Sequence, residues 1–337
     1  MKLRLLACLL SVSLLSGCAR NIIYSDYREI DQLELVQTLG VDRSGDLVTA
    51  TASTAAMEEP LVLKNTSVSV SRAMREMQDY TSKKYIFYGH TNHLLVGEEA
   101  ARESLSLFME HMERSVEMRL DTELYIVEGA RAEELISAVG QSGTTAGDLL
   151  ESLAKDVELM SESHVFTCGE VAEMLASRDC GVAAAIRLVR EPNILVGAGN
   201  STIQSCGYAL LKDEKLVGFL DVNLARGANL LMGLGGSDVV EVPDSGGGWA
   251  AIRLTKNSVK YEAEFRDGKI AGVRVRVKVT GNLDELQNPL DVYSEENIAL
   301  FEQGLSDIQS YRVRRALERA QELGADFYGI GDRKSVV

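Results

Sequence analysis

The sequence predicts a mixed α+β protein of several domains, lipid-anchored at its amino end, in which helices pack on mixed or antiparallel sheets. Three observations carry this prediction: an export signal ending at a cysteine, helices and strands that interleave through the first half, and a run of strands followed by one long helix in the second. Apolar residues make up 45% of the chain and there are only four prolines, which is typical of globular proteins. We expect three domains.

The amino end has the pattern of a lipoprotein signal peptide over residues 1–17. Lys2 and Arg4 precede an apolar run over residues 5–15. This run is too short to span a bilayer as a stable helix and has the length of a signal-peptide core. Small residues then lead into a cysteine, so Leu15-Ser16-Gly17-Cys18 has the form of a lipobox.

We therefore expect cleavage before Cys18 and a covalent diacylglycerol and N-acyl lipid on this residue, followed by a lipidated tether over residues 18–26. The mature protein would be held at the membrane, facing outside the cytoplasm, by two or more acyl chains. The alternative is an ordinary secretory signal with a chance cysteine. No later run is long and apolar enough to span a membrane, so the lipid would be the only membrane anchor in the sequence.

The chain is acidic, with a formal net charge of −15. An acidic body is repelled by anionic lipid headgroups and is a poor partner for nucleic acid. A basic patch must therefore be local. The best candidate is the cluster Arg312, Arg314, Arg315 and Arg319, although helical spacing also suits a solvated helix face.

Residues 27–196 are expected to form two α/β subdomains with a break near 130–145. Residues 35–42 and 47–54 flank a glycine-containing turn and predict a β-hairpin. Either Thr66 or Ser67 is expected to cap a helix that runs to about residue 80, with Val68, Met74 and Met77 on its apolar side. Further along we expect extended chain over 85–96, a helix over 98–113, a strand over 121–128, helices over 132–139, 144–160 (capped by Thr145) and 170–176, and a strand over 182–189.

A linker over residues 191–202 is expected to precede a carboxy-terminal domain over 203–332. Here the pattern predicts a hairpin of residues 207–211 and 216–220, a helix over 221–231, and strands over 238–242, 249–254, 259–265 and 270–279. In the last strand Arg274, Arg276 and Lys278 alternate with valines, which predicts one buried and one solvated face. A long helix over 294–323 follows, with an inward stripe of Ile298, Phe301, Leu305, Ile308 and Leu317, the terminating residue Gly324, and a final strand over 326–331.

Few residues have the spacing of a reactive site. His90 and His93 form an H-x-x-H pair, but in a strand or loop and without the glutamate of an H-E-x-x-H motif, so surface or core histidines are the default. Glycine runs at 197–199 and 233–236 do not complete a phosphate-binding loop and are expected to be turns. No metal, cofactor or catalytic residue is predicted, and binding or assembly is favoured over catalysis.

Three cysteines remain in the body of the mature chain: Cys168, Cys180 and Cys206. An odd number in an exported protein argues against a complete disulfide framework. A single bridge from Cys168 to Cys180 is one possibility. Buried free thiols are favoured, because a chain of this length does not need disulfides to fold.

Several short stretches resemble one known family along almost the whole chain. They are Arg28-Glu29-Ile30, Gly40-Val41-Asp42, residues 84–91 with 94–100, Met118-Arg119-Leu120-Asp121-Thr122, Val127-Glu128-Gly129, Gly207-Tyr208-Ala209, residues 216–221, Arg226-Gly227 and residues 326–331. In order and spacing these resemble the Ger(x)C family, the GerAC-type lipoprotein C subunits of spore nutrient germinant receptors. One departure is Asp26-Tyr27, which stands where the family usually has a tryptophan-aspartate pair before R-E-I.

The resemblance implies a non-catalytic receptor subunit of three domains, on the outer face of the spore inner membrane. It implies membrane-embedded A and B subunits as partners, and a requirement for nutrient-triggered germination. It supplies no ligand site on this subunit. Two alternatives are a lipid-anchored solute-binding protein of a transporter, which would bind a small solute by itself, and an exported hydrolase, which would need a catalytic constellation.

Overall fold

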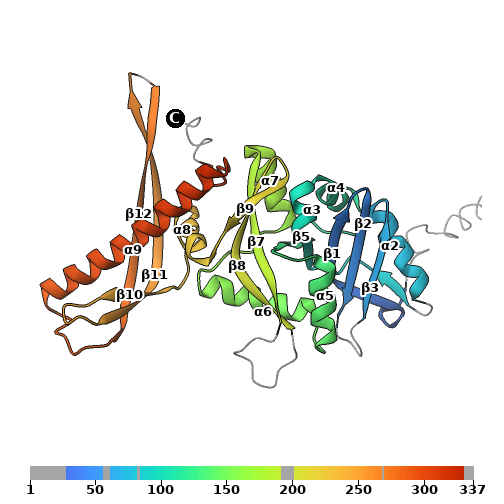
Figure 1. The fold of residues 1–337 in the computed structure, drawn as a ribbon, viewed down its shortest axis with the longest axis horizontal. Coiled ribbons are helices and arrows are strands. Elements are labelled where there is room, and N and C mark those ends of the chain that lie inside the picture. Colours follow the sequence, from blue (N-terminus) through green and yellow to red (C-terminus); the bar gives the residue numbers. More distant parts are fainter. Residues whose placement is uncertain (1–27, 56–60, 82–83, 191–200, 268, 330–337) are drawn as a thin grey trace, which may run out of the picture.

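The computed structural model describes residues 28–55, 61–81, 84–190, 201–267 and 269–329. Within these ranges the molecule is elongated and contains two sheets, a large one near the amino end and a small one at the far end of the long axis (Figure 1). Both carry helices, so the predicted mixed α+β class with mixed and antiparallel sheets is confirmed.

The large sheet has the strand order β3-β2-β1-β5-β6-β7-β8-β9, with β4 pairing β1 off this path. β1 to β3 are antiparallel, β1, β5, β6 and β7 are parallel neighbours, and β7 to β9 are again antiparallel. The strands are β1 (Leu33–Ser44), β2 (Leu47–Thr54), β3 (Val62–Ser67), β4 (Tyr85–Phe87), β5 (His93–Gly97), β6 (Glu123–Val127), β7 (Cys180–Arg190), β8 (Ser201–Lys212) and β9 (Lys215–Leu220).

Helices pack on this sheet and fill its two faces with apolar side chains. They are α2 (Val70–Met77), α3 (Glu98–Glu103), α4 (Ser106–Arg114), α5 (Ala132–Gln141), α6 (Ala146–Leu159) and α7 (Cys168–Arg178), with short 3-10 turns η3 (Ile30–Gln32) and η4 (Gln78–Tyr80). The predicted hairpin at residues 35–54 is confirmed, and Gly45 takes φ 60° in its turn. Thr145 caps α6 as predicted, because its side chain accepts a hydrogen bond from the Asp148 N–H.

Two predictions in this half were wrong for reasons that lie outside the local sequence. Thr66 and Ser67 belong to β3, where they pair with β2, so α2 starts later and is capped by Ser69. Val68 is consequently exposed. The helix expected over 98–113 is broken into α3 and α4, because the Leu105 N–H donates to the Glu214 carbonyl of the β8–β9 turn at 2.7 Å.

The small sheet is antiparallel in the order β10-β11-β12, and two helices pack beside it. Its elements are β10 (Val239–Pro243), β11 (Trp249–Arg266), β12 (Lys269–Leu286), α8 (Val222–Met232) and α9 (Glu295–Glu322). The strands predicted over 249–254 and 259–265 are one strand, because a register shift at Leu254/Lys256 lets β11 continue along β12 without interruption. Gly324 follows α9 with φ 64°, as predicted.

The closing segment predicted as a strand over 326–331 is a turn in its described part. The Gly329 N–H donates to the Asp326 carbonyl at 3.2 Å, and Gly329 has φ 66°. Phe327 and Tyr328 are buried in the core that α8 and α9 share with β7 to β9. Residues 330–331 lie outside the described residues.

The domain boundaries stay predictions. β7 and β8 lie on opposite sides of the expected linker and pair through eleven residue pairs of the same sheet, from Cys180↔Lys212 to Arg190↔Ser201. Residues 191–200 of the linker lie outside the described residues.

Candidate functional site: the groove between β12 and α9

The predicted lipid-attachment residue, Cys18, lies outside the described residues, as do the signal peptide and the tether. Lipidation therefore stays a prediction. The other residues that the sequence singled out can be placed in the fold.

His93 is a core residue of the large sheet, 3% exposed on β5. Its Nδ1 lies 3.3 Å from the Thr38 hydroxyl and its Nε2 lies 3.7 Å from a Glu123 carboxylate oxygen. Burial lowers the pKa of His93 to about 4, so the ring is neutral at physiological pH. Among the residues the structure describes, no group of three or more potential metal ligands comes together, so the pair His90 and His93 gains no further ligand.

Cys168, Cys180 and Cys206 are buried free thiols. Burial raises the pKa of Cys168 to about 12 and also raises the pKa of Cys180 and of Cys206. The nucleophile and metal ligand is the thiolate, which these environments disfavour. All three therefore have the properties of core residues.

The glycine run at 233–236 is a turn, as expected, in which Gly233 takes φ 76° after the last residue of α8. The tip between β10 and β11 is organised by Asp244, whose carboxylate accepts from the Gly246 and Gly248 N–H groups at 2.8 and 2.7 Å. The run at 197–199 lies outside the described residues.

The arginine cluster of α9 is not one basic patch. Arg312 is turned inward and donates to Asp238 at 2.7 Å, while Arg315 and Arg319 pair with Glu318 and Glu322 on the helix surface. Three of the four charges are therefore compensated by carboxylates. Arg314 lies beside an open groove.

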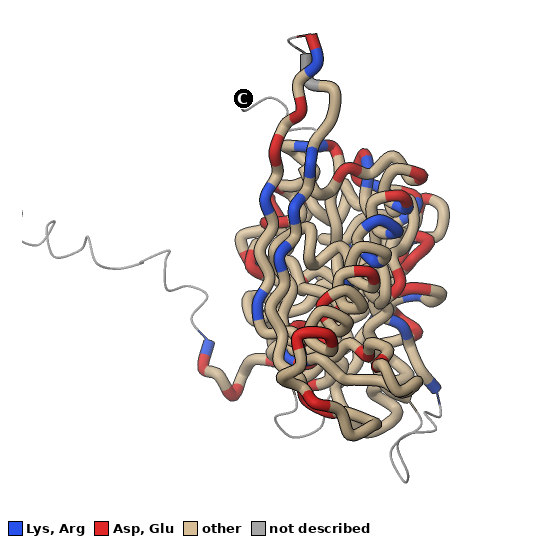
Figure 2. Tube along the Cα trace, turned by 90° about the vertical axis from the view of Figure 1, so that its left-hand side faces the viewer, with Lys and Arg blue, Asp and Glu red and all other residues tan. Residues whose placement is uncertain are grey.

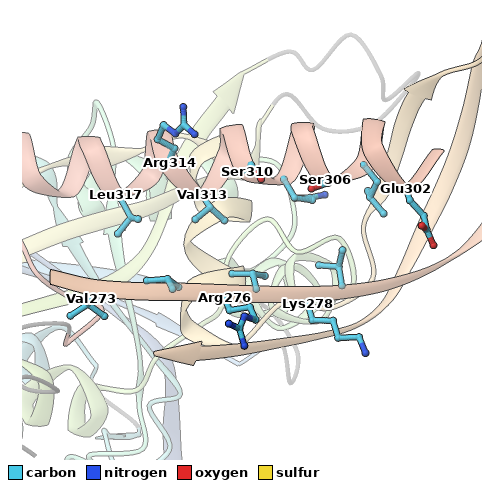
Figure 3. A pocket seen from close by; sticks show the side chains of 14 residues that line it. Val273, Arg276, Lys278, Glu302, Ser306, Ser310, Val313, Arg314 and Leu317 are labelled. Carbon is cyan, nitrogen blue, oxygen red and sulfur yellow. The ribbon is translucent and has the colours of Figure 1, made fainter. Parts of the chain in front are cut away.

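This groove has a volume of about 740 Å³ and runs between β12 and α9. Its floor is the valine row Val273, Val275, Val277 and Val279. Val313 and Leu317 point toward it from α9, whereas Arg276 and Lys278 point away from α9 (Figure 3). The valines are half-buried, so the face that the sequence predicted to be buried is only partly covered.

Gln309 lines the same groove from α9. It is 5% exposed, yet its Nε2 donates no hydrogen bond to any described residue. A buried amide without an acceptor is uncommon in folded proteins. The groove thus has an apolar floor, and the Gln309 amide beside it is closed to solvent.

The sequence could not reveal the groove. Alternating valines predict that one face of β12 avoids water, but the alternation is the same whether a helix covers that face closely or stands off from it. The distance of α9 is set by its packing on β10 and α8, through contacts distant in sequence.

Fold and site together define a multi-domain mixed α+β protein with an open groove between β12 and α9. Two family models match the chain: "Spore germination protein N-terminal domain" over residues 26–188 and "Spore germination B3/ GerAC like, C-terminal" over residues 206–335. The chain belongs to this GerAC-type family of spore germination proteins.

Two relatives agree with this assignment. "Spore germination protein KC" of Bacillus subtilis (strain 168) is 19% identical over 363 aligned positions, which cover 96% of this chain and 84% of that protein. The crystal structure of the GerBC protein has the same fold, with a TM-score of 0.54 at 18% identity, over 90% of this chain and 88% of that one. Neither the family descriptions nor the names of these relatives mention an enzymatic activity.

Proposed function

We propose that this protein is the C subunit of a spore germinant receptor, a lipoprotein that has no catalytic step of its own and is required for nutrient-triggered germination. The observation that supports this role best is the match of both halves of the chain, in order, to the two GerAC-type domains. In this role it assembles with a membrane-embedded A subunit and a B subunit, and its part is to position or couple them.

The proposed location is the spore inner membrane, on the face outside the cytoplasm. Within the described ranges, no helix is long and apolar enough to cross a membrane. We assign attachment to the diacylglycerol thioether on Cys18, because the lipobox Leu15-Ser16-Gly17-Cys18 follows a signal-peptide core of the right length. Two or more acyl chains suffice for stable anchoring.

Deletion of the gene in its sporulating host tests the role. Spores of a strain without redundant receptors should fail to lose refractility when nutrients are added, and should still germinate with a trigger that bypasses nutrient receptors. The intact gene, supplied in trans, should restore the nutrient response. Normal nutrient germination of the deletion strain would overturn the proposal.

A further inference from the structure

We propose that the free edge of β12 accepts an extended segment of a different protein, in which apolar side chains alternate with acidic ones. β12 is the outermost strand in the order β10-β11-β12, and no described strand pairs with its other edge. An edge strand presents unpaired N–H and C=O groups that can hydrogen-bond with an added strand. This inference concerns the carboxy-terminal part of the chain alone and does not depend on the proposed receptor role.

The inner side of such a strand would meet the groove. Every residue that lines the groove comes from β12 or α9, and none comes from β11, so the groove opens on the free side of β12. A strand added there would lie about 4.8 Å from β12, with every second side chain on the same face as Val275 and Val277. Because the opposite wall includes Leu305, Val313 and Leu317, apolar side chains fit this position.

The outer side of the added strand would meet positive charge. Lys and Arg recur along both long strands of the β11–β12 hairpin (Figure 2). The register places Lys260 of β11 directly opposite Arg276 of β12, a like-charged pair. Arg274 and Arg276 bind Glu264 and Glu262 at 2.7 and 3.5 Å, which leaves the lysines of this face without a carboxylate.

Lys278 is one of the lysines left without an ionic partner among the described residues on this face. It is solvent-exposed on β12 and lies opposite Ser258, and no described carboxylate lies within ion-pair distance of it or of Lys260. In a chain with a net charge of −15, this face is a local exception. Opposite charges on neighbouring strands stabilise pairing, so acidic side chains fit the outer positions of the added segment.

A second copy of the chain does not fit the same edge. Two β12 strands paired with each other would bring Arg274, Arg276 and Lys278 of one copy against the same row of the other. Like charges across a strand pair are destabilising. Repulsion between these basic side chains therefore disfavours self-association at the edge of β12. A protein of different sequence is the better occupant.

The test uses the whole protein in detergent and a synthetic peptide that alternates valine and glutamate over eight residues. The control peptide has lysine in place of each glutamate. We expect the acidic peptide to bind, by titration calorimetry, at least about tenfold more tightly than the basic one, since each outer position changes from attraction to repulsion. Hydrogen exchange should show new amide protection within residues 273–279.

Two charge-reversal variants locate the site. Lys278→Glu should weaken binding of the acidic peptide by about tenfold, because it reverses a charge next to the added strand. Lys256→Glu makes the same change in net charge on β11, one strand further from the edge, and should change the affinity by less than about threefold. Both variants should keep the unfolding midpoint of the parent.

Three results would overturn the inference: equal affinity for both peptides, equal effects of the two variants, or binding without protection of residues 273–279. After any of these results, the remaining role for Arg274, Arg276 and Lys278 would be to protect an edge strand from aggregation.

Discussion

Arg312 donates a hydrogen bond to Asp238 at 2.7 Å, which joins the middle of α9 to the residue before β10. Both side chains are largely buried, with 14% and 5% of their side-chain area exposed. Arg226 of α8 approaches the other oxygen of the same carboxylate at 3.5 Å. One carboxylate thus links the two helices to the small sheet. It helps to set the distance between α9 and β12, and therefore the width of the groove between them.

Removal of Arg312 should therefore destabilise the carboxy-terminal part of the protein. Arg312→Ala leaves a buried carboxylate with only a long contact to Arg226, and we expect a loss of about 3 kcal/mol in the free energy of unfolding. Urea unfolding measures this loss. Arg315→Ala removes an exposed pair with Glu318 on the same helix, and because solvent screens such a pair its loss should be far smaller than that of Arg312→Ala. Equal losses in the two variants would contradict this account.

Gly227 provides a second link between α8 and α9. A Cβ at this position would lie 2.3 Å from the Arg312 carbonyl oxygen, which belongs to backbone and cannot turn away. Gly227→Ala should therefore push the helices apart and cost about 2 kcal/mol, despite the better helix propensity of alanine.

The matched control for this variant is Gly304→Ala in α9. There the nearest atom to a new Cβ would be the Cβ of Val242, at 3.2 Å. A slight crowding is offset by a gain of about 1 kcal/mol in helix propensity, so its unfolding midpoint should stay close to that of the parent. If Gly227→Ala is as stable as this control, the close approach of the helices is not a constraint.

How much the sequence could predict depended on whether the decisive contact was local. Thr145 and Gly324 are recognisable because caps and terminating glycines act within a few residues. Ser69 was missed as the cap of α2, because pairing with β2 draws Thr66 and Ser67 into a strand. The break at Leu105 depends on a carbonyl more than one hundred residues away.

The same distinction between local and distant contacts decides which parts of the candidate site the sequence can predict. Alternation of valines with basic residues was visible in β12, but the charge balance of its outer face depends on the register with β11. The burial of the Gln309 side chain could not be recognised, since a glutamine in a helix usually faces water. The number of arginines in α9 indicates a basic patch, but carboxylates compensate three of the four: Arg312, Arg315 and Arg319.

The buried thiols should be unreactive in the folded protein. Burial raises the pKa of Cys168 to about 12 and raises that of Cys206, so few thiolates exist near pH 8. A chain that starts at residue 19 should release no thionitrobenzoate from dithionitrobenzoate within minutes, and three equivalents after unfolding in guanidinium. Rapid reaction of the native protein, or fewer than three equivalents after unfolding, would contradict the structure.

His93 should make the fold sensitive to mild acid. Burial lowers its pKa from 6.5 to about 4, so between these values the unfolded chain binds a proton that the folded chain does not. The free energy of unfolding should therefore fall as the pH drops from 6.5 to 4, by up to about 3 kcal/mol. The raised pKa of Glu123, also caused by burial, acts in the opposite direction.

Comparison with His93→Gln separates the histidine from the other groups. Glutamine has no proton to gain in this range and can still bond to the Thr38 hydroxyl. Unfolding by urea at several pH values between 4 and 7 should show a shallower decline for the variant than for the parent. Parallel curves would mean that His93 is not the group responsible.

Cys18→Ala tests the proposed anchor most directly. The variant should leave the fold unchanged, because the described body starts ten residues later and has its own core. It should move from the membrane to the soluble fraction when no other receptor subunit is present, since an acidic body is repelled by anionic lipid headgroups. Fractionation followed by immunoblotting measures this. Retention of the variant at the membrane without other subunits contradicts the assignment. Retention only in their presence means that the A and B subunits supply a second attachment, and the lipid then serves to orient the protein as well as to hold it.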